Sequence, residues 1–319
     1  MKNIFYTLVF SFLFSACEIV VDLDIPKHEP VLVLNSVLRS DSVFSAHLTH
    51  SVGSFEMNQI DEVMDATISV FQNEEFLGNM SVAFVGVSDD YYNYETDEYI
   101  EGDSLFKYVL NEVPVIEDTY TFKVSHEEYD DVQVSSALSK SIDFVSHEVT
   151  NLDDEYSEMY KLNFTFNDMS GDNYYRLRVI NKNLDVFDFE DVEPLYFETS
   201  DPSIIASSMS DNGDPDEVGV FLHDALFDDQ LFDGEEKIIS LDFYDWYYSG
   251  DETYSSFYLE ISSISKDYFD YLQSYQRQSN YYGGELFAGE PVQVFTNVQN
   301  GLGIFGASNT TSIKLILPE

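Results

Sequence analysis

Histidine is the side chain best suited to acid–base or metal chemistry near neutral pH, and this chain has six: His28, His47, His50, His126, His147 and His223. None lies in an HExxH pattern. His47 and His50 are three residues apart, which on a strand places them on opposite faces. Since a G-x-S-x-G nucleophile elbow is also missing, the sequence predicts neither a catalytic residue nor a metal site of these kinds.

Carboxylates are so abundant that their spacing does not identify a functional pair. The chain has 60 Asp and Glu residues, so neighbouring pairs arise by chance and a glycosidase-type acid pair cannot be selected. The most calcium-like loop is Asp211-Asn212-Gly213-Asp214-Pro215-Asp216-Glu217, because hard oxygen ligands surround a glycine. It lacks the register of an EF-hand loop. Both a calcium site and an ordinary exposed loop are compatible with this segment.

Aromatic residues form the clearest candidate binding surface. The single tryptophan stands among tyrosines, and a second tyrosine pair follows later: Tyr244, Trp246, Tyr247, Tyr248, Tyr281 and Tyr282. Such rings can stack on sugars or anchor a protein partner. Cross-strand packing is the alternative, because alternating aromatics are common in half-buried sheets. We treat Trp246, Tyr247, Tyr248, Tyr281 and Tyr282 as candidate binding residues.

Cys17 is the only cysteine, so an intrachain disulfide is excluded. It follows an export signal that begins with Lys2, continues with an apolar stretch from Ile4 to Phe14 and ends in Ser15-Ala16, the small residues that a signal peptidase requires. The alternative is a transmembrane anchor. A run of about 11 apolar residues falls short of the roughly 20 that a membrane-spanning helix needs.

The segment Leu13-Phe14-Ser15-Ala16-Cys17 resembles a bacterial lipobox, although the common pattern has Leu where this chain has Phe14. A thiol is nucleophilic enough to accept a diacylglyceryl group as a thioether. We therefore expect residues 1–16 to be a lipoprotein signal peptide, Cys17 to be the lipidated N-terminus and residues 17–29 to be a tether. Several acyl chains, at about 0.8 kcal/mol per buried methylene, would anchor the protein to a membrane.

The charge of the chain excludes one class of partner. Its formal net charge is −46, with 14 Lys and Arg residues, so nucleic acid would be repelled. With 44% hydrophobic residues the chain is nevertheless able to fold, and 319 residues suggest two domains. An acidic surface favours basic partners or divalent cations, or it is simply a solvated exterior that resists association.

Apolar and polar residues alternate with a period of two in most of the segments that would position the candidate residues. The alternation is clear over residues 31–38, 43–52, 66–71, 105–110, 120–124 and 132–134, which predicts a β-sandwich of immunoglobulin or transthyretin-like type over residues 30–140. The acidic, tyrosine-rich stretch 88–103 is the expected long loop.

A second β-rich domain is predicted over residues 145–319, after a lapse in the strand pattern near 139–150. One prominent helix is expected near 265–279, capped by Ser265, with Tyr268, Tyr271, Leu272 and Tyr275 on one apolar face. A strand is expected at 291–297, and residues 200–216 are expected to form an exposed loop. The fold class is therefore mostly β, with two sandwich-like domains.

Ten segments of the mature chain together resemble one known family. They are Val31 to Ser51, Ala66 to Val70, Thr119 to Val124, Phe164 to Asp168, Asp172 to Tyr175, His223-Asp224, Phe232-Asp233-Gly234, Tyr268 to Ser274, Pro291 to Asn297 and Gly301 to Gly306. They are similar to an uncharacterised outer-membrane lipoprotein family of Bacteroidota type, classed as a domain of unknown function. The resemblance implies no catalytic residue. It implies a context, because such lipoproteins are usually encoded beside TonB-dependent receptors.

Three functions are compatible with these observations. The leading hypothesis is a non-enzymatic outer-membrane lipoprotein, on the cell surface or the periplasmic face, that serves as an accessory or ligand-binding partner of a TonB-dependent receptor. The alternatives are a surface hydrolase acting on peptide or glycan and a structural envelope adhesin. No cofactor is predicted. A convergent buried acid pair in a cleft would favour the hydrolase, and a flat aromatic patch ringed by polar residues would favour the accessory.

Overall fold

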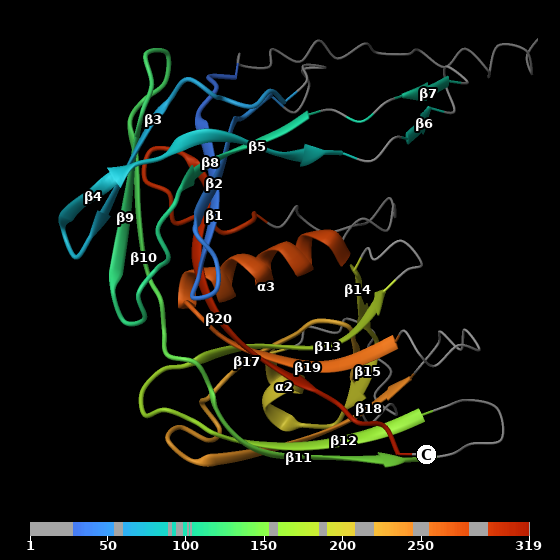
Figure 1. The fold of residues 1–319 in the computed structure, drawn as a ribbon. Coiled ribbons are helices and arrows are strands. Elements are labelled where there is room, and N and C mark those ends of the chain that lie inside the picture. The colour runs from blue at the N-terminus through green and yellow to red at the C-terminus, as the bar shows by residue number, and fades with distance from the viewer. Residues whose placement is uncertain are drawn as a thin grey trace, which may run out of the picture.

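The computed structural model describes residues 28–53, 60–88, 91–93, 98–100, 102, 104–152, 159–184, 190–207, 220–244, 255–280 and 293–318. Within these residues the chain is mostly β, as predicted from the alternation. Its strands form two sandwiches, which lie one above the other in Figure 1.

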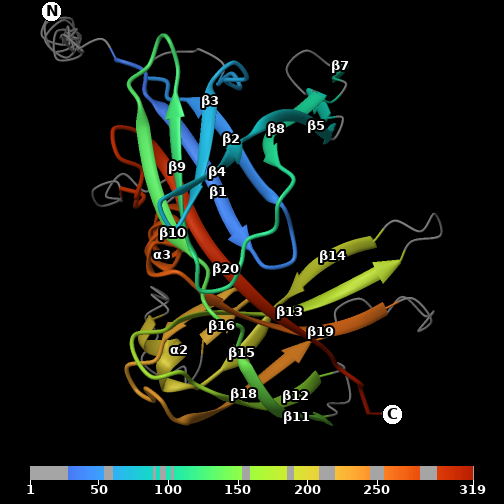
Figure 2. The ribbon, with the colours of Figure 1, turned by 60° about the vertical axis from the view of Figure 1, so that its left-hand side comes forward.

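Two sheets form the first sandwich, and its strands are β1 (Leu32–Arg39), β2 (Phe44–His50), β3 (Thr67–Gln72), β4 (Glu75–Asn79), β5 (Ser81–Val87), β8 (Ser104–Leu110), β9 (Thr119–Ser125), β10 (Val132–Ala137) and β20 (Leu302–Lys314). One sheet has the order β20-β1-β2-β8-β5, and the other has the order β10-β9-β3-β4. A small hairpin of β6 (Tyr91–Asn93) and β7 (Glu98–Ile100) stands apart from both. In Figures 1 and 2 this hairpin extends from the ends of β5 and β8.

The second sandwich is built by β11 (Asp143–Asn151), β12 (Met159–Asn167), β13 (Tyr174–Leu184), β14 (Glu190–Leu195), β15 (Phe197–Thr199), β16 (Val220–Leu222), β17 (Ala225–Asp228), β18 (Glu236–Tyr244) and β19 (Ser255–Ile264). Its sheets have the orders β14-β13-β19-β20, with β17 also pairing β13, and β11-β12-β18-β15-β16. Two described helices accompany these strands: α2 (Pro202–Ser207) and α3 (Lys266–Asn280).

Each sandwich has its own apolar core, produced by the alternation seen in the sequence. In β1, Leu32, Leu34, Ser36 and Leu38 are buried, and Val33, Asn35 and Val37 between them are half-buried. The second core is rich in phenylalanine, and β12 contributes alternate buried side chains such as Phe164 and Phe166. Such alternation is typical of strands with one face against a core.

Strand β20 belongs to both sandwiches. Its first half pairs with β1 in parallel, from Leu302 to Ser308, and its second half pairs with β19 in antiparallel fashion, from Ser308 to Lys314. Phe305 stacks on Phe122 of the first core with ring centroids 4.1 Å apart. Figure 2 shows the strand running from the upper sandwich into the lower one. Residues 302–308 therefore complete the first sandwich, although the sequence assigns them to the second domain.

The structure also changes four local predictions. The lapse near 139–150 contains β11, an edge strand that is largely exposed and so lacks alternation. The expected loop 88–103 carries the hairpin of β6 and β7. The described part of the expected strand 291–297, residues 293–297, has no regular structure, and α2 lies within the expected loop 200–216.

Helix α3 begins where the sequence predicts. The N–H of Tyr268 donates to the Ser265 hydroxyl at 3.4 Å, and the same hydroxyl accepts from Ala307 of β20 at 3.1 Å. The predicted face is wrong in part: Tyr275 is 53% exposed, whereas Phe269 is buried against the sheet. Figure 1 shows α3 lying between the two sandwiches. No helix among the described residues is long and apolar enough to cross a membrane.

Close backbone approach explains the glycines near the end of the chain. Gly303 has a φ of +104°, and a Cβ there would lie 2.1 Å from the Leu34 carbonyl oxygen. A Cβ on Gly306 would lie 2.7 Å from Cβ of Tyr268 in α3. Glycine is needed at both positions because β20 runs against β1 and beneath α3 without space for a side chain.

Candidate functional site

The site residues predicted from sequence lie outside the described residues. This holds for Cys17, for the aromatic candidates Trp246, Tyr247, Tyr248, Tyr281 and Tyr282, and for the calcium-like loop 211–217. Tyr244 is the last residue of β18. The roles assigned to these residues therefore stay predictions.

Two histidines hold the segment before β3 to the first sandwich. Nε2 of His47, on β2, lies 3.2 Å from Glu62, and Nε2 of His126, just after β9, lies 2.9 Å from Asp65. The backbone N–H of Ala66 also donates to the Tyr108 hydroxyl at 3.0 Å. These contacts fix the chain where it crosses from one sheet to the other, so the two histidines have a structural role here.

Three carboxylates converge at one end of the second sandwich, and we call them the acid cluster. Asp168 follows β12, Asp229 follows β17, and Asp233 lies in the turn before β18. Each offers an oxygen within 4.8 Å of the others, and the first two residues are buried. In the described part of the chain this is the only such group of three or more His, Cys, Asp or Glu side chains.

Hydrogen bonds from the chain itself occupy the acid cluster. Asp168 accepts from the Tyr175 hydroxyl and, at 2.7 Å, from the backbone N–H of Gly234. Oδ2 of Asp229 accepts from the backbone N–H of Asn173 at 2.9 Å and from its side-chain amide at 3.0 Å. The third carboxylate accepts a backbone N–H at 2.9 Å. The cluster thus ties the turn before β18 to the turn before β13.

Burial raises the pKa of two groups in this network, Asp229 and Tyr175. Desolvation raises the pKa of Asp229, the hydrogen bonds from Asn173 oppose the shift, and the charge of Asp168 adds to it. The pKa of Tyr175 is also raised, first by burial and then by its bond to Asp168, so its hydroxyl stays a donor. Oxygen ligands suit a hard cation. Because all three side chains already accept bonds from their own chain, we interpret the acid cluster as a structural clasp.

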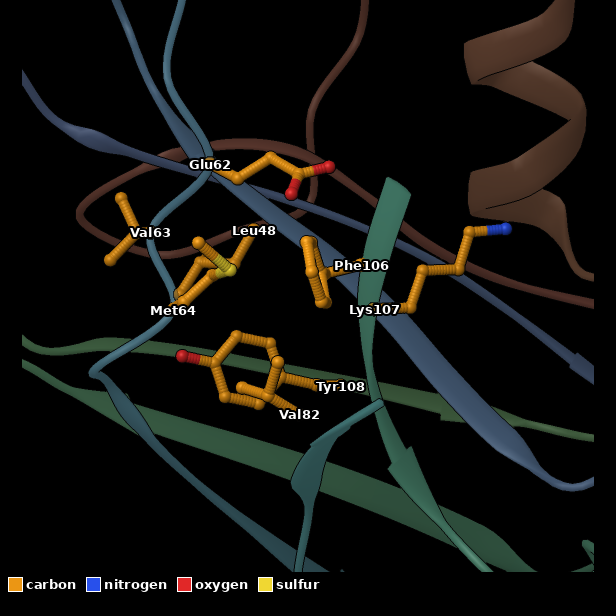
Figure 3. A pocket seen from close by; sticks show the side chains of 8 residues that line it. All are labelled: Leu48, Glu62, Val63, Met64, Val82, Phe106, Lys107 and Tyr108. Atoms are coloured by element: carbon orange, nitrogen blue, oxygen red, sulfur yellow. The ribbon is translucent and has the colours of Figure 1, made fainter. Parts of the chain in front are cut away.

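A shallow apolar hollow opens at the side of the first sandwich (Figure 3). Leu48, Val63, Met64, Val82, Phe106 and Tyr108 line it, with Glu62 and Lys107 at its margin. In Figure 3 the rings of Phe106 and Tyr108 face Met64 and Val82, whereas Lys107 extends away from them. The hollow lies between core residues of the first sandwich, such as Leu48 and Tyr108, and Val82 of strand β5.

Strand β5 extends this apolar surface to the sheet edge. Among the strands that the structure describes it pairs only with β8, and Val82 and Phe84 lie opposite Tyr108 and Phe106 in the register. Val82 is 39% exposed and Phe84 is 59% exposed, although Tyr108 on the same face is buried. The opposing sheet therefore leaves the inner face of this edge uncovered. We call the exposed part of β5 and β8, with the hollow, the apolar edge.

Sequence reasoning missed both features, for different reasons. The Asn167-Asp168 and Asp233-Gly234 pairs were visible, but 60 acids gave no reason to select them. The apolar edge had a usable signal, because the run Ser81 to Val87 contains no charged residue. Edge strands are usually protected by charges or proline, so an uncharged run of this kind is informative once its edge position is known.

Comparison with known proteins identifies one matching family and no matching curated protein. No curated protein matches the chain. A family model described as a domain of unknown function, DUF4249, matches residues 19–314. The match spans both sandwiches and the shared strand β20. The chain therefore belongs to the DUF4249 family, whose members share a domain of unknown function.

Proposed function

We propose that this protein is a non-enzymatic lipoprotein of a bacterial outer membrane that acts as an accessory or ligand-binding partner of a TonB-dependent receptor. The observation that carries the proposal is its only cysteine, Cys17, placed directly after an export signal. A thiol at that position is suited to lipid attachment and is unsuited to a disulfide. The outer membrane and the receptor are suggested by the sequence resemblance to lipoproteins encoded beside such receptors.

The apolar edge supports a role in binding a protein. Contiguous exposed apolar surface commonly marks an interaction site. Here Phe84 is 59% exposed on a protein whose formal charge of −46 otherwise favours solvation. An exposed apolar surface of this kind supports a binding role for the protein.

Co-isolation from native membranes tests the proposal. The full chain with a C-terminal tag is extracted in mild detergent, and the recovered proteins are quantified by mass spectrometry. We expect a TonB-dependent receptor in near-stoichiometric amount. Cys17→Ala protein is the matched control, since it should stay unprocessed or soluble and should recover less receptor. Recovery of the lipoprotein alone, together with hydrolysis of peptides or glycans by the purified protein, would favour the hydrolase instead.

A further inference from the structure

A line of polar side chains crosses the outer face of the β10-β9-β3-β4 sheet, which Figure 1 shows at the left of the upper sandwich. Its members lie directly opposite one another in the register, and they are Asn79, Ser69, Lys123, Gln133 and Gln299. We call them the polar row. Neighbouring strands are about 4.8 Å apart, so the row presents one polar side chain at each such step.

An open groove of about 440 Å³ runs over the middle of the polar row. Four of the five row members line it, together with Phe71 of β3. Its volume falls within the roughly 300–1,000 Å³ that is common for sites of small molecules. The floor comes from β3, β9 and β10, whereas the wall comes from residues 299–300, which are far away in sequence. The groove is therefore a product of the fold.

The wall of the groove is held in place by the first sandwich. The backbones of Gln133 and Gln299 exchange two hydrogen bonds, of 3.0 and 3.4 Å. The side-chain amide of Asn300 donates to the carbonyl of the residue before β10 at 3.2 Å. Gly301 seats the turn against β1, because a Cβ there would lie 2.7 Å from the Leu32 carbonyl oxygen. A wall fixed in this way lowers the ordering cost of binding a ligand.

The polar row offers hydrogen bonds of both kinds. The amides of Gln133 and Gln299 belong to exposed residues, and each amide can donate and accept. The Ser69 hydroxyl donates within the row at 2.8 Å and can also accept. The Lys123 ammonium group lies 4.7 Å from the centroid of the Phe71 ring and supplies further donors. Hydroxyl groups of a ligand, which both donate and accept, match such a row.

Two phenylalanine rings form an apolar flank beside the polar row. Phe71 and Phe76 lie opposite each other in the register, and their rings meet edge to face with centroids 5.7 Å apart. Phe76 is 60% exposed. The C–H faces of sugar rings pack against aromatic side chains, while sugar hydroxyls turn toward polar groups. A polar row with an aromatic flank therefore suits an oligosaccharide.

Charge and strand pairing narrow the ligand further. Among the residues that line the groove, Lys123 is the one cation and Asp131 is the one acid, so the site favours neither sign of charge. The formal net charge of −46 would repel a polyanion. A peptide cannot be added as a strand at the floor, because β9 and β3 are each paired on both sides. Recognition must therefore come from the side chains.

We propose that the polar row binds an uncharged oligosaccharide that lies across the strands, with its hydroxyl groups on the row and its C–H faces against the two phenylalanine rings. The strand spacing is close to the rise of one sugar unit in an extended chain, so successive units meet successive row members. This inference goes beyond the proposed function, because such binding needs neither a lipid on Cys17 nor a receptor.

Three variants locate the binding. Gln133→Ala removes one amide from the polar row, and Gln299→Ala repeats the change at the wall. Ser135→Ala is the matched control, because Ser135 is exposed on the same face of β10 but does not line the groove. Equal thermal midpoints would show that all three variants fold, so that a difference in binding reports on the position of the side chain.

Calorimetric titration of the full chain, in a detergent without a sugar head group, measures the binding. The probes are cellohexaose, xylohexaose, mannohexaose and maltohexaose, and hexagalacturonate is the charged control. We expect at least one uncharged chain to bind, with an affinity that changes little with salt. This affinity should fall about tenfold in Gln133→Ala and in Gln299→Ala and stay the same in Ser135→Ala. Failure of all four uncharged chains to bind, stronger binding of hexagalacturonate, or equal losses in Gln133→Ala and Ser135→Ala would overturn the proposal.

Co-isolation from membranes separates this inference from the proposed function. Gln133→Ala should recover as much receptor as wild type does. A smaller recovery would make the polar row a receptor contact, which overturns the proposal. If wild type recovers no receptor, the proposed function fails, and the calorimetric titration still decides whether the polar row binds an oligosaccharide.

Discussion

Single residues in this protein show how burial changes the behaviour of an abundant residue type. Among the acids that the structure describes, Asp168 and Asp229 are distinguished by burial and by the donors that Tyr175, Gly234 and Asn173 bring to them. A carboxylate that is buried beside another carboxylate pays a desolvation penalty when it ionises. The acid cluster therefore links the stability of these turns to pH.

The raised pKa of Asp229 predicts a dependence of stability on pH. A carboxyl whose folded pKa exceeds its unfolded value contributes stability below the unfolded pKa, and that contribution is lost as pH rises through the folded pKa. Asp229→Asn keeps an oxygen for Asn173 and removes the charge. We expect its melting temperature to exceed that of wild type at neutral pH, with the difference shrinking below the ordinary pKa of aspartate.

The melting temperatures of wild type and Asp229→Asn, measured between about pH 3 and about pH 8, test this prediction. Asp233→Asn, at an exposed position, is the control and should change the midpoint less. The same melts run with EDTA should match those without it. A lower midpoint for Asp229→Asn, together with destabilisation of wild type by EDTA, would show instead that the acid cluster holds a divalent cation.

The sequence was most informative about secondary structure. For helix α3 it predicted the bounds correctly and the buried face only in part. Its bounds followed from Ser265 and from apolar residues at helical spacing. Its buried face did not, because a tyrosine satisfies an apolar pattern whether its ring is covered or not. Tyr268, Tyr271 and Tyr275 stack on one another along the helix, while Phe269 is the residue that enters the sheet.

Phe269 should therefore dominate the contribution of α3 to stability. Its ring is 5% exposed and lies 5.0 Å from that of Tyr174, beside Leu226 and Ile264. Truncating a buried phenylalanine costs about 3–5 kcal/mol, so Phe269→Ala should lower the free energy of unfolding by that amount in urea denaturation. Tyr275→Ala should change it by about 0.5 kcal/mol or less. Comparable losses in the two variants would place the buried face where the sequence predicted it.

Two glycines with nearly the same positive φ allow a test of the close approach between β1 and β20. Gly303 and Gly171 have φ of +104° and +103°, but only Gly303 lacks room for a Cβ. Gly171→Ala should cost about 1–3 kcal/mol from backbone strain. Gly303→Ala should cost clearly more, because its Cβ would meet the Leu34 carbonyl across the β1 and β20 pair. Urea denaturation of both variants compares the costs, and equal values would contradict the close approach of these strands.

At the scale of the whole molecule, strand alternation predicted the two sandwiches but not their connection. Alternation could not reveal that β20 changes partner at Ser308, because residues 304–307 are all buried and the period of two is lost there. The parallel pairing with β1 joins residues almost 270 positions apart in sequence, such as Val33 and Leu302. Aromatic candidates such as Trp246 lie outside the described residues, so only the apolar edge connects the structure to the proposed function.

The shared strand predicts that both sandwiches unfold together. Phe305 is fully buried against Phe122 in the first core, and the same strand pairs with β19 in the second sandwich. Calorimetry should show one transition whose van't Hoff enthalpy equals the calorimetric value. Phe305→Ala should shift that whole transition to lower temperature. Two resolved transitions, with only the first moved by Phe305→Ala, would show that the sandwiches are independent.

Membrane attachment through Cys17 underlies the proposed function, and the intact mass of the protein extracted from membranes tests it most directly. The account predicts a chain that lacks residues 1–16 and carries a diacylglyceryl thioether on Cys17, with its remaining mass matching residues 17–319. Hydrolysis of the ester-linked acyl chains should lower the mass, for each chain released, by the mass of one fatty acid less one water. A free thiol at Cys17, or an uncleaved chain that begins at Met1, would contradict the account.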